Sequence, residues 1–248
     1  MREFKVDHLT VRVFESRAEM GGAAAEACKT AMAEVLGAKE EINMIFAAAP
    51  SQNEFLVELR TADFSKVNAF HMDEYVGLPH AAPQRFAAFL TDALFGRVRM
   101  KSVNLMDSEA DAEAECARYA ALLASHPCDI MCMGVGENGH IAFNDPHVAD
   151  FSDPRSVKVV QLDDVCRMQQ VHDGCFESLS DVPKRAMTLT IPTLVAPKVI
   201  FCVVPARTKA GAVRAMLTGP ITEACPASIL RTRPGATLWL DADSASLL

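Results

Sequence analysis

The sequence has no apolar run near the roughly 20 residues that cross a bilayer, and its charged first residues lack a signal-peptide core. It also has no low-complexity tract and no internal repeat. Positive charge is scarce, because 24 lysines and arginines face 32 acidic residues, for a formal net charge of −8. This balance argues against nucleic acids and anionic membranes as partners. We therefore expect a globular cytoplasmic protein.

No CxxC pair occurs among the eight cysteines, so the sequence shows no zinc or dithiol motif. Most of these cysteines lie in apolar segments of a chain that, at 248 residues, can bury a large core without disulfides. We expect buried free thiols and no metal site.

Apolar runs alternate with amphipathic segments, which is typical of an α/β protein with a mostly parallel sheet and helices on both faces. Strands are expected at 9–14, 42–49, 67–74, 98–106, 128–133, 186–195, 198–206 and 236–241, and helices at 17–36, 53–59, 85–95, 109–124 and 207–219. Capping boxes are expected at Ser16–Glu19 and Ser51–Glu54. No linker divides the chain, so residues 1–248 should form a single domain, with the aperiodic stretch 147–182 as a mobile lid.

The stretch CDIMCMGVGENGHIAFNDP, residues 128–146, joins a buried strand to a turn with three glycines spelling GxGxxG. A dinucleotide site would need a long helix after the last glycine, and Pro146 follows too soon for one. His140 and Asp145 come just beyond the strand, at the sheet edge where open α/β sheets bind ligands. From spacing alone, a simple turn and a ligand loop both remain open.

Two adjacent acids, Asp73 and Glu74, follow another apolar strand and are flanked by apolar residues. A carboxylate in a partly apolar setting has a raised pKa, which suits a general base near neutral pH. An exposed turn with a helix cap is the alternative interpretation.

Cations and a helix start indicate an anion site. Lys209 lies in the first turn of an expected helix, where a positive charge opposes the helix dipole unless an anion is bound. Ser51 follows a buried strand at another helix start, where unpaired N–H groups favour negative charge. Arg167, in the expected lid, could reach such an anion on closure. Simple helix capping by Ser51 and surface exposure of the two cations are the plainer alternatives.

Two segments, FHMDEYVGLP at 70–79 and GVGENGHIAFNDP at 134–146, resemble the signature segments of the glucosamine-6-phosphate deaminase/isomerase family. The resemblance extends through most of the chain, including PASIL at 226–230. It implies a Rossmann-like fold, a hexosamine 6-phosphate as substrate, and no metal or redox cofactor.

By the same resemblance, Asp73 is the base that moves a proton between C2 and C1, and His140 is the acid that opens the sugar ring. Asn138 and Asp145 would assist the histidine. For the substrate we expect contacts with Ser51, Glu74, Gly136, Gly139, Arg167 and Lys209.

The sequence departs from the family pattern at three places. Asn138 stands where many relatives have Asp, and Asp145 stands where Glu is usual. The sequence AAPS at 48–51 replaces a glycine-rich TGST-like turn. These changes bear on substrate and rate more than on fold.

The leading hypothesis is conversion of glucosamine 6-phosphate and water to fructose 6-phosphate and ammonia, in amino-sugar catabolism. The alternatives are action on galactosamine 6-phosphate, hydrolysis of 6-phosphogluconolactone, and a non-catalytic sugar-phosphate sensor. The MDEY and GHIAFN segments favour the deaminase over the lactonase. A homo-oligomer is compatible with the sequence.

Overall fold

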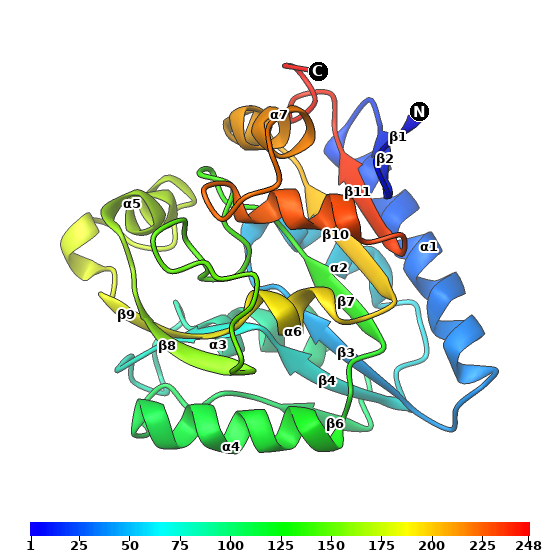
Figure 1. Ribbon diagram of the computed structural model, residues 1–248. Helices are drawn as coiled ribbons and strands as arrows, with labels where there is room; N and C mark the ends of the chain where they lie inside the picture. Colours follow the sequence, from blue (N-terminus) through cyan, green and yellow to red (C-terminus); the bar gives the residue numbers. More distant parts are fainter.

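The computed structural model describes residues 1–248, built around one eight-stranded sheet (Figure 1). The strands are β1 (Arg2–Val6), β2 (Leu9–Val13), β3 (Ile42–Phe46), β4 (Val67–His71), β5 (Asp73–Tyr75), β6 (Ser102–Asn104), β7 (Ile130–Met133), β8 (Val157–Gln161), β9 (Arg185–Leu189), β10 (Val199–Val204) and β11 (Ala236–Leu240). The α-helices are α1 (Arg17–Leu36), α2 (Asn53–Leu59), α3 (Phe86–Leu90), α4 (Ala112–Ser125), α5 (Asp164–His172), α6 (Ile191–Val195) and α7 (Ala210–Thr218). Short 3₁₀ helices are η1 (Pro50–Gln52), η3 (Leu179–Asp181), η4 (Arg207–Lys209) and η5 (Pro226–Thr232), and η2 (Thr91–Phe95) is a π-helical turn.

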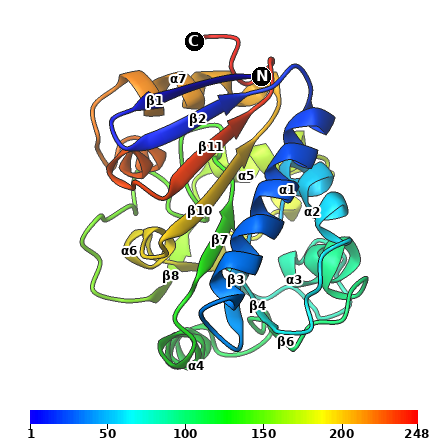
Figure 2. The same cartoon turned by 90° about the vertical axis from the view of Figure 1, so that its right-hand side faces the viewer.

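The large sheet has the strand order β1-β2-β11-β10-β7-β3-β4-β6, and all its pairs are parallel except β1–β2 (Figure 2). Helices cover both faces, as the alternating pattern predicts. Helices α1, α2 and α3 contribute to the core on one face, and α4, α6 and α7 contribute to the core on the other. The predicted fold class is therefore confirmed.

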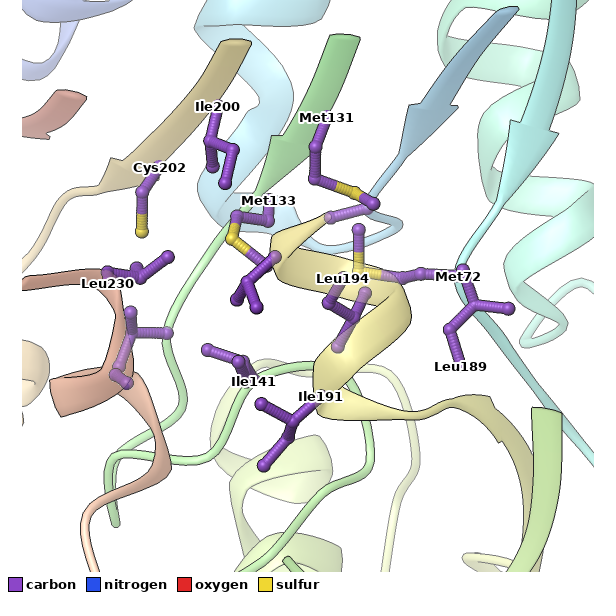
Figure 3. Packing of buried hydrophobic residues seen from close by; sticks show 14 of the residues in the cluster. Met72, Met131, Met133, Ile141, Leu189, Ile191, Leu194, Ile200, Cys202 and Leu230 are labelled. Carbon is purple, nitrogen blue, oxygen red and sulfur yellow. The ribbon is translucent and has the colours of Figure 1, made fainter. Parts of the chain in front are cut away.

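Side-chain alternation along the strands divides the core between the two faces of the sheet. On β7, Met131 and Met133 belong to one apolar cluster, whereas Ile130 and Cys132 belong to the other. Figure 3 shows the first cluster, in which the two methionines pack close to Leu194 of α6. Strands buried on both faces explain the continuous apolar runs of the sequence.

Several expected elements end earlier than the sequence pattern suggests. The strand expected at 67–74 stops at His71, and Asp73–Tyr75 instead forms β5 of a separate antiparallel sheet with the order β5-β9-β8. The strand expected at 186–195 stops at Leu189, and α6 follows with Pro192 in its first turn. Proline suits the first helical turn because no intrahelical N–H bond is lost there.

The stretch 147–182 is not an irregular loop, because it contains β8 and α5. Pairing of β8 with β9, the middle strand of the small sheet, explains its order. Its mobility as a lid stays a prediction.

Only one of the two expected capping boxes contains its serine cap. Ser16 Oγ accepts the N–H of Glu19 at 3.2 Å, although the Glu19 carboxylate accepts the N–H of Glu15 rather than that of Ser16. The second box is wrong, because α2 begins after η1 without a side-chain cap, and Glu54 instead pairs with Arg17 at 2.9 Å.

All eight cysteines are free thiols; five of them are buried and three are partly buried. No helix has the combined length and apolar character that crossing a membrane requires.

Candidate active site

A cavity lies at the carboxyl ends of the central strands, where an open α/β sheet binds ligands. The residues that follow β3 (Ala47–Gln52), β7 (Gly134–His140) and β10 (Pro205–Lys209) supply most of its wall, and residues of α1, α3, α5 and β5 are among the others. Among the residues that line it are Ser51, Asp73, Gly136, His140 and Lys209, all expected from the sequence. The fold therefore brings half of the ten expected site residues into one cavity.

The glycine turn after β7 presents His140. The N–H of Gly136 donates to the carbonyl of His140 at 2.9 Å, which closes the turn. A Cβ atom on Gly136 would lie 2.0 Å from Cε1 of the His140 ring, so only glycine leaves room for the imidazole. Gly139 has φ +84°, a left-handed conformation that costs glycine nothing. Both glycines shape the turn.

Asn138 and Asp145 hold the His140 ring by one nitrogen. His140 Nδ1 lies 2.7 Å from Asn138 Oδ1 and 3.1 Å from Asp145 Oδ1. Asn138 Nδ2 donates to the same carboxylate oxygen at 3.0 Å. Because Nδ1 is engaged in this way, Nε2 is the nitrogen available to a ligand in the cavity.

The Asp145 carboxyl is suited to remain ionised. Its burial acts to raise the pKa, but the hydrogen bonds and charge of His140, with the hydrogen bond of Asn138, outweigh burial and lower the pKa below its usual value. A buried carboxylate beside Nδ1 stabilises the imidazolium that forms when His140 takes up a proton. The shorter arm of Asp, compared with Glu, still reaches the ring.

Asp73 is the acid in the cavity wall. It lies on β5, opposite Thr188 of β9, and only 6% of its surface is exposed. Burial, and secondly the charge of Glu74, raise the pKa of Asp73 well above its usual value. A carboxylate in this state is a stronger base than a solvated one, which suits proton abstraction near neutral pH.

Glu74, expected to bind substrate, does not line the cavity, and this expectation is corrected. Successive side chains on a strand point to opposite faces, so Glu74 points away from the side on which Asp73 lies. Its carboxylate accepts the backbone N–H groups of Tyr75, Phe86 and Ala87 at 2.9, 3.1 and 2.9 Å. Glu74 therefore fixes the start of α3 against β5.

Arg167, the expected lid cation, also lies outside the cavity lining. Its guanidinium donates to Asp164 at 2.8 Å and to the carbonyls of Leu179 and Val182. These bonds tie α5 to the segment that follows it. The hydrogen bonds of the Arg167 side chain therefore serve to hold α5 in place.

Lys209 and Ser51 remain the candidates for binding an anion. Lys209 is 4% exposed at the end of η4, and its burial lowers the pKa while Asp173 and Glu137 act to raise it. Ser51 Oγ accepts a hydrogen bond from Gln52 Nε2 at 3.1 Å. The Ser51 hydroxyl hydrogen is therefore free to donate to a ligand oxygen.

Other polar residues of the cavity were not expected from the sequence, among them one on α1 and three on or just after α5. Arg17 comes from α1 and donates both to Glu54 and to the carbonyl of Pro50. Gln169, Gln170 and Asp173 come from α5 and the residue after it. No motif marks these positions, since their approach depends on how α1 and α5 pack. Gln169 also contacts the glycine turn, because its Oε1 accepts the backbone N–H of Glu137 at 2.9 Å.

His140, Asp145 and Cys166 form the buried group of donor atoms that comes nearest to a metal site, since these atoms lie within 4.8 Å of one another. Burial raises the pKa of the Cys166 thiol far above its usual value, so this cysteine stays neutral. Metals prefer the thiolate. Because His140 Nδ1 is also engaged with Asn138 and Asp145, the cluster fits proton transfer better than metal binding.

Known proteins resemble the chain in sequence and in structure. A family model described as glucosamine-6-phosphate isomerases/6-phosphogluconolactonase matches residues 15–239. A glucosamine-6-phosphate deaminase of Listeria monocytogenes is 37% identical over 212 residues, which are 84% of this chain and 88% of that protein. A glucosamine-6-phosphate deaminase of Bacillus thuringiensis is 35% identical over 226 residues, covering 90% of this chain and 84% of that protein.

Among solved structures, one described as a monomeric glucosamine-6-phosphate deaminase superposes with a TM-score of 0.88 at 29% identity, covering 96% of this chain and 99% of that chain. A 6-phosphogluconolactonase from Thermotoga maritima superposes with a TM-score of 0.76 at 18% identity, over 94% of this chain and 99% of that chain. The latter likeness concerns the fold alone.

Proposed function

This chain belongs to the family of glucosamine-6-phosphate isomerases and 6-phosphogluconolactonases, and on that premise we propose that it is a glucosamine-6-phosphate deaminase. The reaction converts glucosamine 6-phosphate and water to fructose 6-phosphate and ammonia. One observation carries the proposal. A buried carboxyl with a raised pKa, Asp73, and an imidazole held by one nitrogen, His140, line the same cavity.

His140 opens the sugar ring. The closed pyranose hides its aldehyde, so the ring oxygen must gain a proton while the hydroxyl on C1 loses one. Nε2 of His140 can make both transfers, because an imidazole gains and loses protons near neutral pH. Asp145 stabilises the charged ring between these transfers, and Asn138 keeps it oriented.

Asp73 moves the proton between carbons. In the open-chain aldehyde, the proton on C2 is acidic, and Asp73 removes it while the aldehyde oxygen takes up a proton, which leaves an enolamine with a double bond between C1 and C2. The protonated Asp73 then delivers its proton to C1 as the amine nitrogen gives up one proton, and an imine forms at C2. Water adds to C2 and ammonia leaves, so the ketose is formed with atoms balanced. A base with a raised pKa suits both halves of this transfer.

The phosphate is placed by Lys209 and Ser51, which line the cavity after β10 and β3. Lys209 supplies a charge-assisted hydrogen bond, and the Ser51 hydroxyl donates a second. Arg17 lines the same cavity and is a further cation within this wall. Gly136 contributes room for the imidazole near the sugar rather than a contact of its own.

Lactone hydrolysis is the second candidate in the family, and it is disfavoured by chemistry. That reaction breaks a C–O bond and moves no proton between carbons, so it does not require a base that carries a proton from C2 to C1. The relatives that are 35–37% identical are deaminases by name. The net reaction adds water and cleaves a C–N bond, which makes the enzyme a hydrolase suited to the breakdown of amino sugars, N-acetylglucosamine among them.

Purified protein incubated with glucosamine, galactosamine and mannosamine 6-phosphates, with 6-phosphogluconolactone as a fourth substrate, tests the proposal. We expect ammonia and fructose 6-phosphate in equal amounts from glucosamine 6-phosphate, and slower turnover of the C4 epimer. Turnover of the lactone alone would overturn the proposal. Tight binding of the amino sugar without any product would indicate a sugar-phosphate sensor instead.

A further inference from the structure

Ala206 adopts a backbone conformation that side-chain-bearing residues rarely take. It stands between β10 and η4 with φ +82° and ψ +146°, a region populated almost entirely by glycine. Such a conformation is energetically unfavourable for alanine and persists only when neighbouring groups hold it. It occurs in the cavity wall itself, since Ala206 lines the cavity beside Lys209.

The group that holds Ala206 is the carboxylate of Asp241. Both oxygens accept the Ala206 N–H, at 3.2 and 3.1 Å. Asp241 directly follows β11, which pairs in parallel with β10, so the two strand ends bring the residues together. The Asp241 side chain is buried with 2% of the residue exposed. A buried carboxylate that accepts from an N–H group makes a stronger bond than a neutral acceptor.

Asp241 is itself fixed by the turn that follows it. Its Oδ1 accepts the N–H of Ser244 at 2.7 Å, and its own N–H donates to Ser244 Oγ at 3.2 Å. Ser244 is fully buried. The carboxylate thus has one orientation, set by the turn Asp241–Ser244.

A backbone hydrogen bond connects the strained residue Ala206 to the buried Lys209. The carbonyl of Ala206 accepts the N–H of Lys209 at 3.0 Å, which closes the first turn of η4. If Ala206 relaxed to an ordinary conformation, this carbonyl would rotate and the turn would move. The Lys209 ammonium would then leave its place in the cavity.

We propose that Asp241 is a positioning residue for the substrate phosphate, acting through Ala206 to fix the turn that carries Lys209. The proposal rests on the proposed role of Lys209. Asp241 does not line the cavity, so it should affect binding of the phosphate, through Lys209, more than the proton transfers.

Asp241→Asn is the first test. An amide offers an N–H where the carboxylate accepts, so the N–H of Ala206 or of Ser244 loses its partner. We expect KM for glucosamine 6-phosphate to rise about tenfold, because a hydrogen bond to a charged group is lost, while kcat changes less than about threefold. The inhibition constant of inorganic phosphate, measured as a competitive inhibitor, should rise by the same factor.

Ala206→Gly supplies a rescue that a purely structural role would not show. Glycine adopts φ +82° without strain, so Ala206→Gly in the Asp241→Asn background should recover much of the lost phosphate affinity. As a matched control, Asp111→Ala removes an exposed carboxylate that caps α4 by accepting the Ala114 N–H at 2.9 Å. This variant should lose some stability and keep KM unchanged.

Calorimetric titration with inorganic phosphate separates this inference from the proposed function. If Lys209→Ala and Asp241→Asn both weaken phosphate binding, Asp241 positions the cation even in a protein that fails to deaminate any hexosamine phosphate. If Asp241→Asn binds phosphate as tightly as the unaltered protein, the inference is wrong. A fall in kcat as large as the rise in KM, without rescue by Ala206→Gly, would also overturn it.

Discussion

Asn138 is joined to His140 by two hydrogen bonds that meet at a single oxygen. Asn138 Oδ1 accepts the His140 backbone N–H at 3.0 Å and lies 2.7 Å from ring Nδ1. An amide oxygen can only accept, so Nδ1 carries a hydrogen, and in the neutral ring Nε2 carries the lone pair. The ring is therefore prepared to take the proton from the hydroxyl on C1.

Asn138→Leu tests this arrangement. Leucine is similar in size but cannot accept from Nδ1, so the ring loses its fixed tautomer and orientation. We expect kcat to fall about 10- to 100-fold with KM little changed, since ring opening and not ground-state binding is impaired. Steady-state kinetics on glucosamine 6-phosphate measure both constants. An unchanged kcat would mean that Asp145 alone orients the ring.

Gly136→Ala should remove activity by displacing the imidazole. The new Cβ would lie 2.0 Å from Cε1 of His140, so the ring must move by more than an ångström. Misplacement on that scale costs about 100-fold in rate. Gly211→Ala is the control, because a Cβ at Gly211 meets nothing within 4 Å. This change, in helix α7, should stabilise the protein slightly and leave kcat unchanged. Equal activity of Gly136→Ala and Gly211→Ala would contradict the predicted clash with the His140 ring.

Asp73→Asn should make the protein more stable at neutral and alkaline pH. A carboxyl whose pKa is higher in the folded state than in the unfolded state takes up protons on folding, so its contribution to stability falls as pH rises between the two values. Asparagine does not titrate. The variant should therefore match the unaltered protein near pH 4, the ordinary range of the carboxyl, and exceed it by about 1–3 kcal/mol at pH 8.

Urea unfolding of both proteins at several pH values gives this difference directly. The comparison cancels the titration of every other group that keeps its environment. A difference that shrinks as pH rises would mean that the Asp73 carboxylate is stabilised, not destabilised, by its surroundings.

Lys209→Ala should mainly raise KM. A phosphate contact is made in both the ground state and the transition state, so its loss weakens binding without slowing bound substrate. A rise of about 10- to 100-fold is expected for a charge-assisted bond. Arg207→Ala removes an exposed cation from the same turn and should change KM less than about twofold. If the two variants behave alike, general attraction rather than a specific contact holds the phosphate.

Sequence patterns predict the sheet, its helices and the glycine turn because apolar runs, helical periodicity and glycine spacing are local signals. They do not separate β4 from β5, since residues 67–74 are predicted as one strand, whereas the chain changes sheets after His71. They also place both neighbouring acids in the site. Asp73 faces the cavity and Glu74 accepts three backbone N–H groups, because successive side chains on β5 point to opposite faces.

Long-range packing decides the remaining features of the site. The contact between Asp241 and Ala206 joins residues 35 positions apart, and alanine gives no warning of a left-handed conformation. Arg17 reaches the cavity through its pairing with Glu54, which the sequence had suggested as part of a cap. Arg167 is bonded to groups of its own segment. Apart from Asp164, which lies three residues before Arg167 on the same helix, these partners cannot be predicted from spacing.

Transfer of the C2 proton tests the central claim most directly. Glucosamine 6-phosphate carrying deuterium at C2 is incubated with the enzyme in ordinary water, and NMR follows loss of the label and its appearance at C1 of the ketose. The unaltered protein should remove the label from C2, and Asp73→Asn should bind the substrate yet leave the label untouched. Removal of the label by Asp73→Asn at the normal rate would contradict the assignment of Asp73 as the base.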